Sequence, residues 1–499
     1  MSNIRIGWCE KDISTDKAVN IPGQFHMRIS TGVMDSLTTT ALVLIDGDET
    51  AIFLSADCVV IRACLYDEVI AKVKAKNPAI PAERILMNAT HTHEGASHYR
   101  DTTTFAAATQ KDIEDSGIAS SDEYREFMGT QCADAVCEAW EKAQDGAVCW
   151  GYGYAVVGHS RRTTYLEDVS NGEKSGFAIN GHAVMYGKTD DPRFAGYESG
   201  SDHFVNLLYT FDTKGNLTGA IVNVPCPSQN SEHEYQLSGD YWHNIRTEIR
   251  RRYGDHIFIL GQCAAAGDLS PRILHYLKAQ QRRMKLKYGV ENYNGSSKAL
   301  AERQDIAERV ADAFGEVLSW ARKDMRTEAV IKYQSRELQL SRRKITDDEY
   351  EYAKEALAER GEVVPKTDGT PRENLNVNSK AVSERNRFKG IIRRYESYES
   401  NPKMPMLAHV IRVGDIAFAS NRFELYMDFM HRIQARSPFE QTFIVQLAGV
   451  PGEEGGSYLA TTKGAMNKGY SASMYCNQVS PEGGQELVEG TLEMLNTLL

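Results

Sequence analysis

Residues 85–95 read ILMNATHTHEG, an apolar run that gives way to polar residues within one short segment. The apolar half has the length and composition of a buried strand. In an extended chain, residues i and i+2 point to the same side, so His91 and His93 face together while Thr90 and Thr92 face away. Two neutral imidazoles on one face can bind a zinc ion at about 2.0–2.1 Å. The segment therefore predicts either a zinc site or a strand-end pair of histidines that make ordinary hydrogen bonds.

Strands and helices alternate along most of the chain, which indicates its fold class. Short β-rich runs at 41–45 and 51–55 flank a turn at 46–48 and predict a hairpin. Ser120 and Glu123 form a capping-box pattern, which opens a helix. Further strands or helices are expected at 61–76, 84–89, 206–209, 220–224, 241–252, 256–260, 296–323, 409–419, 421–435 and 442–448. This alternation favours an α/β fold with a mixed sheet, in one large domain that spans 1–499.

The segment 341–403 differs from the rest of the chain in its polarity. Thr346 and Glu349 form a second capping box, which predicts a helix that ends at Gly361. The residues that follow, 361–403, are mostly polar and charged. We therefore interpret 341–403 as a charged helical insertion on the surface of the domain and not as a domain boundary.

The charge balance excludes several classes of partner. The chain of 499 residues has 57 Lys and Arg against 68 Asp and Glu, a formal net charge of −11. Nucleic acids and anionic membrane surfaces favour clustered Lys and Arg, so we expect neither as a partner. The sequence contains no run of about 18–20 apolar residues, the length that a membrane span needs. We expect a small-molecule substrate, and the sequence leaves open whether the protein forms a homo-oligomer.

The cysteines indicate the cellular compartment. The nine cysteines are scattered and include no Cys-x-x-Cys pair. The first residues, MSNIRIGWCEKDIS, do not have the apolar core and cleavage site of a secretory signal. Scattered cysteines are typical of reduced thiols packed in a core, so we expect a cytoplasmic protein.

A second chemistry-bearing segment reads GDLSPR at 267–272. Ser before Pro is a common start for a helix, which we expect over 271–278. One interpretation makes Ser270 the cap of that helix. In the other, the hydroxyl lies beside free backbone N–H groups at a helix N-terminus and acts as a nucleophile or an oxyanion donor.

Further along the chain, Glu424 is open to two interpretations. Asn421 followed by Glu424 fits a capping arrangement, in which the carboxylate only satisfies backbone donors. Composition alone does not distinguish Tyr458 and Tyr470 among the 24 tyrosines. None of these residues identifies a reaction by itself.

Taken in chain order, these segments resemble the neutral ceramidase family, the neutral/alkaline non-lysosomal amidases. The similar segments are ATHTH at 89–93 (its metal-binding motif), 156–162 (its arginine-bearing segment), GDLSP at 267–271 (its active-site serine motif), 424–438 (its glutamate helix and Arg-Ser-Pro turn), and the pair Tyr458 and Tyr470. The resemblance covers nearly the whole chain. It implies a neutral ceramidase-like catalytic domain without the separate C-terminal immunoglobulin-like domain.

The resemblance also implies a Zn²⁺ cofactor and its ligands. His91, Glu424 and Tyr458 would bind the zinc ion. His93 would lie beside the metal and contact metal-bound water or substrate. Tyr458 is the weaker ligand, because a phenol must lose or share its proton before it can bind a cation.

Three more residues are assigned to the substrate by the same resemblance. Ser270 would bind or attack the acyl carbon. Tyr470 and Arg161 would orient that carbon. These assignments make the expected reaction an acyl transfer to water.

One segment departs from the family pattern. The family supplies a second zinc histidine in an Asn-x-x-x-His context, whereas residues 223–229 read NVPCPSQ. Cys226 as a thiolate, His233 and Asp240 are the alternative ligands, and Cys226 is equally consistent with a buried, inert core residue. A metal bound by fewer protein ligands and a site without metal are the remaining alternatives.

These observations lead to three functional hypotheses. The first is a zinc-dependent hydrolase that cleaves an amide (N-acyl) bond in a substrate more polar than ceramide. The second is a metal-dependent enzyme that acts on a sugar-like or glycosidic substrate, for which the altered segment at Cys226 and the unusual Glu94 are the motivation. The third is a non-catalytic binding protein that has kept the fold.

Overall fold

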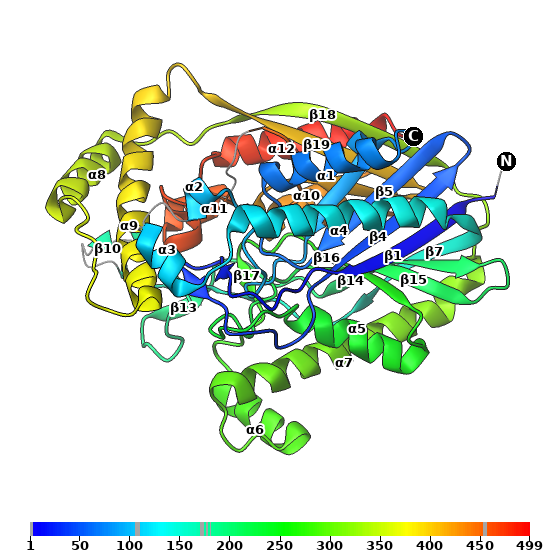
Figure 1. Ribbon diagram of the computed structural model, residues 1–499, viewed down its shortest axis with the longest axis horizontal. Coiled ribbons are helices and arrows are strands. Elements are labelled where there is room, and N and C mark those ends of the chain that lie inside the picture. Colours follow the sequence, from blue (N-terminus) through cyan, green and yellow to red (C-terminus); the bar gives the residue numbers. More distant parts are fainter. Residues whose placement is uncertain (1–2, 105–109, 170–173, 176–177, 180, 453–456) are drawn as a thin grey trace.

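Two β-sheets face each other across one apolar core (Figure 1). The computed structural model describes residues 3–104, 110–169, 174–175, 178–179, 181–452 and 457–499. One sheet has the strand order β16-β15-β14-β7-β1-β4-β5-β6, and the other has the order β18-β19-β20-β22. The two sheets meet closely, because the ring centroids of Phe53 and Phe418 are only 4.6 Å apart.

Both sheets are mixed. The strands of the larger sheet are β1 (Arg5–Asp12), β4 (Thr38–Asp46), β5 (Glu49–Ala56), β6 (Ile85–Ala89), β7 (Gln144–Tyr154), β14 (Phe204–Asp212), β15 (Leu217–Val224) and β16 (Phe258–Cys263). Those of the smaller sheet are β18 (Ile331–Ser341), β19 (Lys403–Val413), β20 (Ile416–Ser420) and β22 (Gln441–Val445). The pairs β5–β6, β15–β16 and β20–β22 are parallel, and the other pairs within these sheets are antiparallel. The expected α/β fold with a mixed sheet is confirmed.

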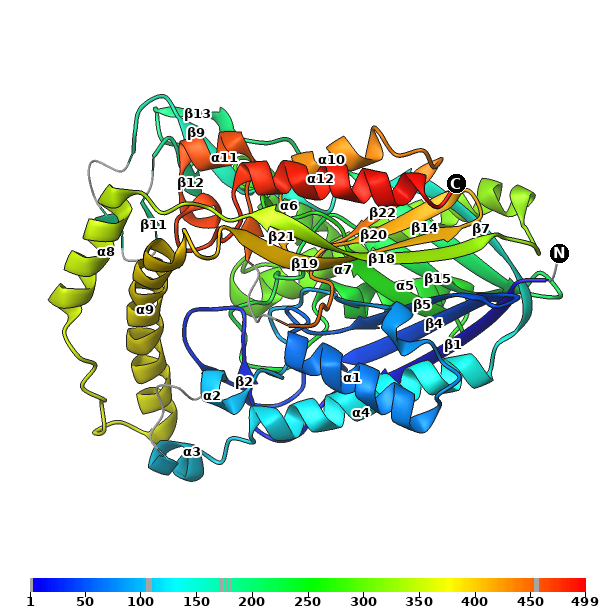
Figure 2. The ribbon, with the colours of Figure 1, turned by 90° about the horizontal axis from the view of Figure 1, so that it is seen from above.

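Strand alternation sorts the apolar side chains between the two faces of the larger sheet. On β4, Leu42 and Leu44 face the smaller sheet, whereas Ala41 and Val43 face the helices on the other side. Those helices are α1 (Ala63–Lys76) and α4 (Ser121–Glu141), with α5 (Tyr241–Tyr253) and α7 (Gly295–Ala321) over the far half of the sheet. On the outer face of the smaller sheet lie α10 (Met427–Gln434) and α12 (Pro481–Asn496). The layers are therefore helix, sheet, sheet and helix, as Figure 2 shows from above.

Several local predictions agree with the structure. The hairpin at 41–55 is β4–β5, and Ser120 caps α4 by accepting hydrogen bonds from Asp122 N and Glu123 N. Thr346 and Glu349 form the predicted capping box of α8 (Asp347–Arg360). In the described part of the chain, no helix is long and apolar enough to cross a membrane.

Two predicted helix starts are wrong, because both segments continue into short paired strands, Leu269–Ser270 with His159–Ser160 and Glu424–Leu425 with Tyr458–Leu459. Ser270 accepts from Arg272 N at 3.2 Å, and its segment forms the short strand β17 (Leu269–Ser270), so no helix begins there. The next helix, α6 (Leu277–Tyr288), begins at Leu277. Asn421 accepts from Phe423 N at 3.0 Å, and the helix expected at 421–435 starts only at Met427.

The segment 341–403 contains a long helix that the sequence did not predict. After α8, helix α9 (Pro371–Ser397) runs for 27 residues from a third capping box at Thr370 and Glu373. Its fully buried apolar residues are few, with Leu375, Phe388 and Ile391 the main ones. This sparse apolar pattern explains why no bounds could be predicted for a helix within the polar part, 361–403, of the charged helical insertion. Helices α8 and α9 lie together at one end of the molecule (Figures 1 and 2).

Candidate active site

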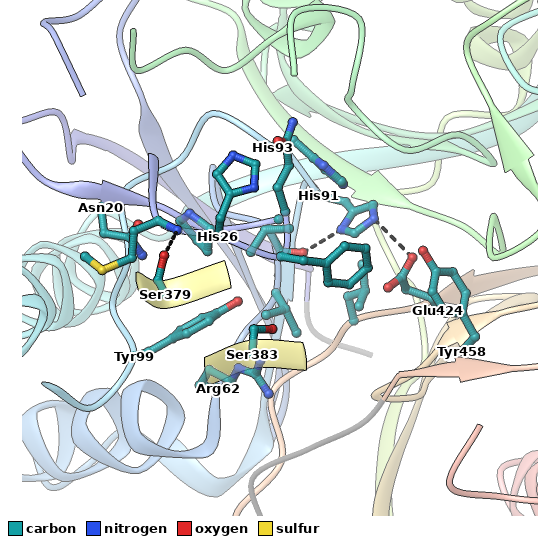
Figure 3. A pocket seen from close by; sticks show the side chains of 18 of the residues that line it. Asn20, His26, Arg62, His91, His93, Tyr99, Ser379, Ser383, Glu424 and Tyr458 are labelled. Atoms are coloured by element: carbon teal, nitrogen blue, oxygen red, sulfur yellow. Dashed lines mark hydrogen bonds and ion pairs between the residues drawn. The ribbon is translucent and has the colours of Figure 1, made fainter. Parts of the chain in front are cut away.

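A cavity of about 380 Å³ lies where the end of β6 meets several segments distant in the chain (Figure 3). One wall is the loop between β2 (Asn20–Ile21) and β3 (Arg28–Ile29), and another is helix α9. His91, His93, Glu424, Tyr458 and Tyr470 all line the cavity. The structure thus brings together five of the residues that the sequence analysis singled out.

His91 lies just beyond β6 in a strained backbone conformation. Its φ is 62°, in the left-handed region that costs a non-glycine residue about 1–3 kcal/mol. Residues 91–93 are therefore not the extended strand on which the facing argument depended. The two imidazoles still meet inside the cavity, with ring centroids 5.0 Å apart.

Hydrogen bonding determines which nitrogen of His91 is free. Nδ1 lies 2.6 Å from the carbonyl oxygen of Val59, and a carbonyl can only accept, so Nδ1 carries the proton. The other nitrogen, Nε2, faces Glu424 and lies 3.5 Å from its Oε2. A backbone carbonyl that holds Nδ1–H is the usual support of a histidine that binds metal through Nε2.

Glu424 and Tyr458 are neighbours because two short strands pair. Strands β21 (Glu424–Leu425) and β23 (Tyr458–Leu459) are parallel, with Glu424 opposite Tyr458. Burial alone would raise the pKa of Glu424. A proton on His91 Nε2 would hydrogen-bond the carboxylate, and that interaction together with the charge of Arg161 lowers the pKa. Burial raises the pKa of the Tyr458 phenol well above its ordinary value, so the phenol keeps its proton at neutral pH in the metal-free site.

Tyr470 lines this side of the cavity, and Arg161 lies behind the lining, beside Glu424 and Tyr458. Arg161 is almost fully buried, donates to the Gly267 carbonyl at 2.8 Å and lies 3.9 Å from Glu424 Oε2. Its guanidinium lies over the Tyr458 ring, 5.3 Å from the ring centroid. Tyr470 meets the same ring edge-on at 5.6 Å. Arg161 and the two tyrosines therefore form a contiguous group beside the carboxylate.

The sequence analysis did not select Glu232, which lies against His93. Its Oε2 is 3.1 Å from His93 Nδ1 and accepts from Gln229 Nε2 at 3.2 Å, while Arg272 pairs with Oε1. Burial would raise the pKa of Glu232, yet His93 and Arg272 hold it below its ordinary value. Gly23, at a φ of 105°, packs on the imidazole, and a Cβ there would lie 3.0 Å from Nδ1.

Glu232 and His233, which the sequence analysis named as an alternative metal ligand, are adjacent in the chain but point in different directions. Successive residues of an irregular loop point different ways, and the side chain of His233 is 75% exposed while that of Glu232 is 10% exposed. Burial lowers the pKa of His93, with Glu232 opposing that effect. A buried histidine with a buried carboxylate partner was therefore detectable only from the folded chain.

Four other candidates lie away from the cavity lining. Ser270 is fully buried in β17, which pairs with β8 (His159–Ser160). Cys226 is fully buried among apolar residues, and burial raises the pKa of its thiol well above the ordinary value, which disfavours the thiolate. Asp240 caps α5 by accepting from Tyr241 N at 2.6 Å, and His233 faces solvent. The structure does not bring these four side chains to His91.

The side chains around His91 supply part of what a zinc site requires. Within the described residues, no three or more His, Cys, Asp and Glu side chains lie close enough together to hold a metal ion. His91 Nε2 and Glu424 Oε2 nevertheless lie 3.5 Å apart. Two ligands bound to a tetrahedral zinc ion at about 2.0–2.1 Å would lie about 3.4 Å apart. The pair therefore fits two positions of a zinc site. The Tyr458 phenol, opposite Glu424 in the β21–β23 pair, is a further candidate donor.

Similar solved structures identify the fold, whereas comparisons of the sequence find no match. No family model matches the sequence, and no curated protein matches it. The crystal structure of neutral ceramidase from Pseudomonas aeruginosa is similar with a TM-score of 0.67 at 16% identity, covering 100% of this chain and 75% of that chain. A structure described as ceramidase complexed with C2 is similar with a TM-score of 0.63 at 15% identity and the same coverage. The chain therefore has a neutral ceramidase-like fold, as its sequence motifs had indicated.

Proposed function

We propose that the protein is a zinc-dependent hydrolase that cleaves an amide (N-acyl) bond in a small substrate more polar than ceramide. The observation that carries this proposal is the convergence of His91, Glu424 and Tyr458 on a cavity that is also lined by His93, whose Nδ1 faces Glu232 behind the lining. The neutral ceramidase-like fold supports the same reaction class. The residues, rather than the fold, have to explain the chemistry.

His91, Glu424 and Tyr458 would hold the metal in this proposal. A zinc ion bound there supplies Lewis-acid polarisation of a substrate carbonyl. Val59 fixes His91 so that Nε2 can present a lone pair, and the charge of Arg161 favours the ionised carboxylate of Glu424. With three protein donors, the site would keep a position open for substrate, as catalytic zinc sites do.

His93 is the residue suited to move a proton. Its lowered pKa leaves the imidazole neutral at pH 7, which is the form that can accept a proton. Glu232 Oε2 lies 3.1 Å from Nδ1 without hydrogen-bond geometry, and its charge favours the proton at Nδ1, which leaves Nε2 as the accepting atom. The charge of Glu232 also stabilises the imidazolium that forms when Nε2 takes a proton from water. The same atom can then deliver the proton to the leaving amine.

In this proposal Tyr470 and Arg161 stabilise negative charge on the substrate. Burial raises the pKa of Tyr470 well above its ordinary value, so its hydroxyl remains a hydrogen-bond donor at neutral pH. Arg161 adds a buried positive charge on the same side. Donors fixed in a site that excludes water stabilise an oxyanion strongly, because no solvent has to reorganise. Ser270, in contrast, would act on the substrate only if it reached the cavity from β17.

The lining of the cavity supports a polar substrate. Asn20, Gln24, His26, Ser379 and Ser383 all present polar side chains to it. The volume of about 380 Å³ is at the lower end of the range for small-molecule pockets, about 300–1,000 Å³. Long hydrocarbon chains would displace water from these polar groups without offering hydrogen bonds in return, which is costly.

The cysteines support a cytoplasmic location for this activity. All nine are buried and free, and none of them forms a disulfide. Free thiols persist where the environment is reducing. We propose that the enzyme acts there on a soluble substrate, without a nucleic-acid partner.

Metal analysis and substrate screening test the proposal together. The purified protein should contain about one zinc ion per chain, and less than about half an equivalent would overturn the metal assignment. His91→Ala and Glu424→Ala should lose the zinc, whereas His233→Ala, a histidine exposed to solvent, should retain it. Soluble N-acyl amines should be hydrolysed, and turnover of glycosides alone would reject the amidase proposal in favour of a glycoside-directed enzyme.

A further inference from the structure

Gln229 lies between two groups of side chains at the candidate active site. It is only 3% exposed. On one side its amide meets Arg161, whose guanidinium lies 3.9 Å from Glu424. On the other side the amide meets Glu232, the carboxylate that faces His93. Gln229 therefore connects the side of the site that holds the proposed metal ligands with the side that holds the proposed proton carrier.

The partners of Gln229 determine which way its amide points. Arg161 Nη1 can only donate, so the atom that it meets at 3.4 Å is Oε1. The pKa of Glu232 is lowered, and its ionised carboxylate can only accept, so the atom 3.2 Å from Oε2 is Nε2. Nε2 also donates to the Tyr186 hydroxyl at 3.2 Å. The reversed amide would place donor against donor and acceptor against acceptor, so the observed orientation is strongly favoured.

The two carboxylate oxygens of Glu232 have different partners. Arg272 pairs with Oε1, whereas Gln229 donates to Oε2, the oxygen that lies 3.1 Å from His93 Nδ1. Arginine frequently binds both oxygens of a carboxylate, because its N–H groups match the carboxylate in geometry. The hydrogen bond from Gln229 opposes such a pairing with Arg272 and keeps Oε2 directed toward His93.

We propose that Gln229 is a positioning residue, which holds Glu232 Oε2 at His93 Nδ1. Gln229 is not one of the described residues that line the cavity, so it acts through Glu232 and not on the substrate. With the carboxylate held there, the proton of the neutral imidazole stays at Nδ1 and Nε2 is free to accept. Without Gln229, the carboxylate turns toward Arg272 and the imidazole populates both tautomers.

This inference rests on the proposed function for the reaction in which His93 takes part. The position of the imidazole proton, in contrast, is a property of the resting protein and is measured without turnover. The two ring nitrogens of a neutral imidazole are distinct, and nitrogen-15 NMR of protein labelled at histidine shows which of them carries the proton. The signals of His93 are those that disappear in His93→Gln.

The tautomer of His93 gives the first result, on the purified full-length protein at one neutral pH. The wild-type protein should show the form protonated at Nδ1. Gln229→Met keeps the length of the side chain but cannot hydrogen-bond Glu232 in the same way, and it should show both tautomers. An unchanged tautomer in Gln229→Met, or protonation at Nε2 in the wild-type protein, would overturn the proposal.

Steady-state kinetics with an N-acyl amine gives the second result. Gln229→Met should lower kcat about tenfold, the effect of one hydrogen bond to a charged group, with KM and zinc content unchanged. Combined with Glu232→Gln, which should itself lower kcat about 10²-fold, Gln229→Met should cause no further loss. A loss of about 10³-fold in the double variant would show two independent effects and would overturn the positioning role.

A second variant and a control separate positioning from general damage. Gln229→Asn keeps a buried amide but is one methylene too short to reach both Arg161 and Glu232, and it should change the tautomer in the same direction. Gln280→Met removes a buried amide from α6 and should leave tautomer and kcat as in the wild-type protein. Equal changes in Gln280→Met would overturn the proposal. If the tautomer responds as expected but no N-acyl amine is hydrolysed, the proposed function fails while the role of Gln229 stands.

Discussion

The two ends of the cavity are built by different kinds of structure. At one end His91, Glu424 and Tyr458 come from strands or strand exits around the two-sheet core; His91 and Tyr458 are buried and Glu424 is partly buried. At the other end Ser379 and Ser383 come from one long helix with a small apolar core of its own. Reacting groups thus depend on strand pairing between distant segments, whereas the substrate wall depends on one helix. A helix wall can change without disturbing the sheets, so we expect chemistry and specificity to respond separately to mutation.

The largest effect is expected at the strand-borne end. His91→Ala should remove zinc and lower kcat/KM by about 10³-fold or more, because it deletes a ligand whose orientation Val59 fixes. Metal analysis and steady-state kinetics measure both quantities. Retention of a full equivalent of zinc with activity near that of the wild-type protein would contradict the assignment.

The helix-borne end should respond by local unfolding. Phe388 is fully buried in the small apolar cluster between α8 and α9, and Phe388→Ala should destabilise this pair of helices by about 3 kcal/mol. Hydrogen exchange should increase in α8 and α9 while the sheets stay protected. Phe418→Ala, in the core between the sheets, is the matched control and should destabilise the whole domain. Equal loss of protection everywhere in Phe388→Ala would show that the two regions unfold together.

Glu232→Gln tests the positioning of His93. The amide keeps the shape of the side chain but removes the charge that stabilises the imidazolium, so kcat should fall by about 10²-fold. Zinc content should remain that of the wild-type protein, because Glu232 contacts His93 and not His91. Loss of zinc together with activity would instead make Glu232 part of the metal site.

Glu94 supplies a pH dependence of stability. It is fully buried, neither carboxyl oxygen has a hydrogen-bond partner among the described residues, and burial raises its pKa to about 10, with the Asp240 charge acting in the same direction. The folded protein therefore keeps this proton where the unfolded chain has lost it. The free energy of unfolding should fall as pH rises from 4.5 toward 10.

Glu94→Gln removes this titration. At pH 8 the variant should be more stable than the wild-type protein by more than about 1 kcal/mol, and near pH 4 the difference should vanish. Urea unfolding at several pH values measures the two curves. Parallel curves across that range would contradict the buried, protonated state of Glu94.

Part of the site was accessible from the sequence because its cues are local. The run 85–93 indicated a buried strand followed by two histidines, and both imidazoles line the cavity. The reason given for their meeting was wrong, since the backbone at His91 is left-handed and not extended. The resemblance to neutral ceramidases pointed to Glu424 and Tyr458, which the sequence patterns alone did not distinguish.

Helix α9 and Glu232 show where local cues failed. The apolar positions of α9 are too few to produce a strong helical period. Its contacts with α8 and Met27 determine which side of the helix is buried. Glu232 and His233 are adjacent and chemically plausible, yet one is buried and the other exposed. No pattern in a short loop distinguishes them, because burial there depends on what packs above it.

The sequence by itself determined the alternation of strands and helices, the capped helix starts at Ser120 and Thr346, and the histidines that end β6, because these depend on neighbours within a few residues. Only the tertiary structure decided that Glu424 pairs with Tyr458, that Glu232 rather than His233 turns inward, and that Cys226 stays in the core. Those outcomes depend on strand pairing and burial between segments far apart in the chain, where many arrangements satisfy the same local preferences.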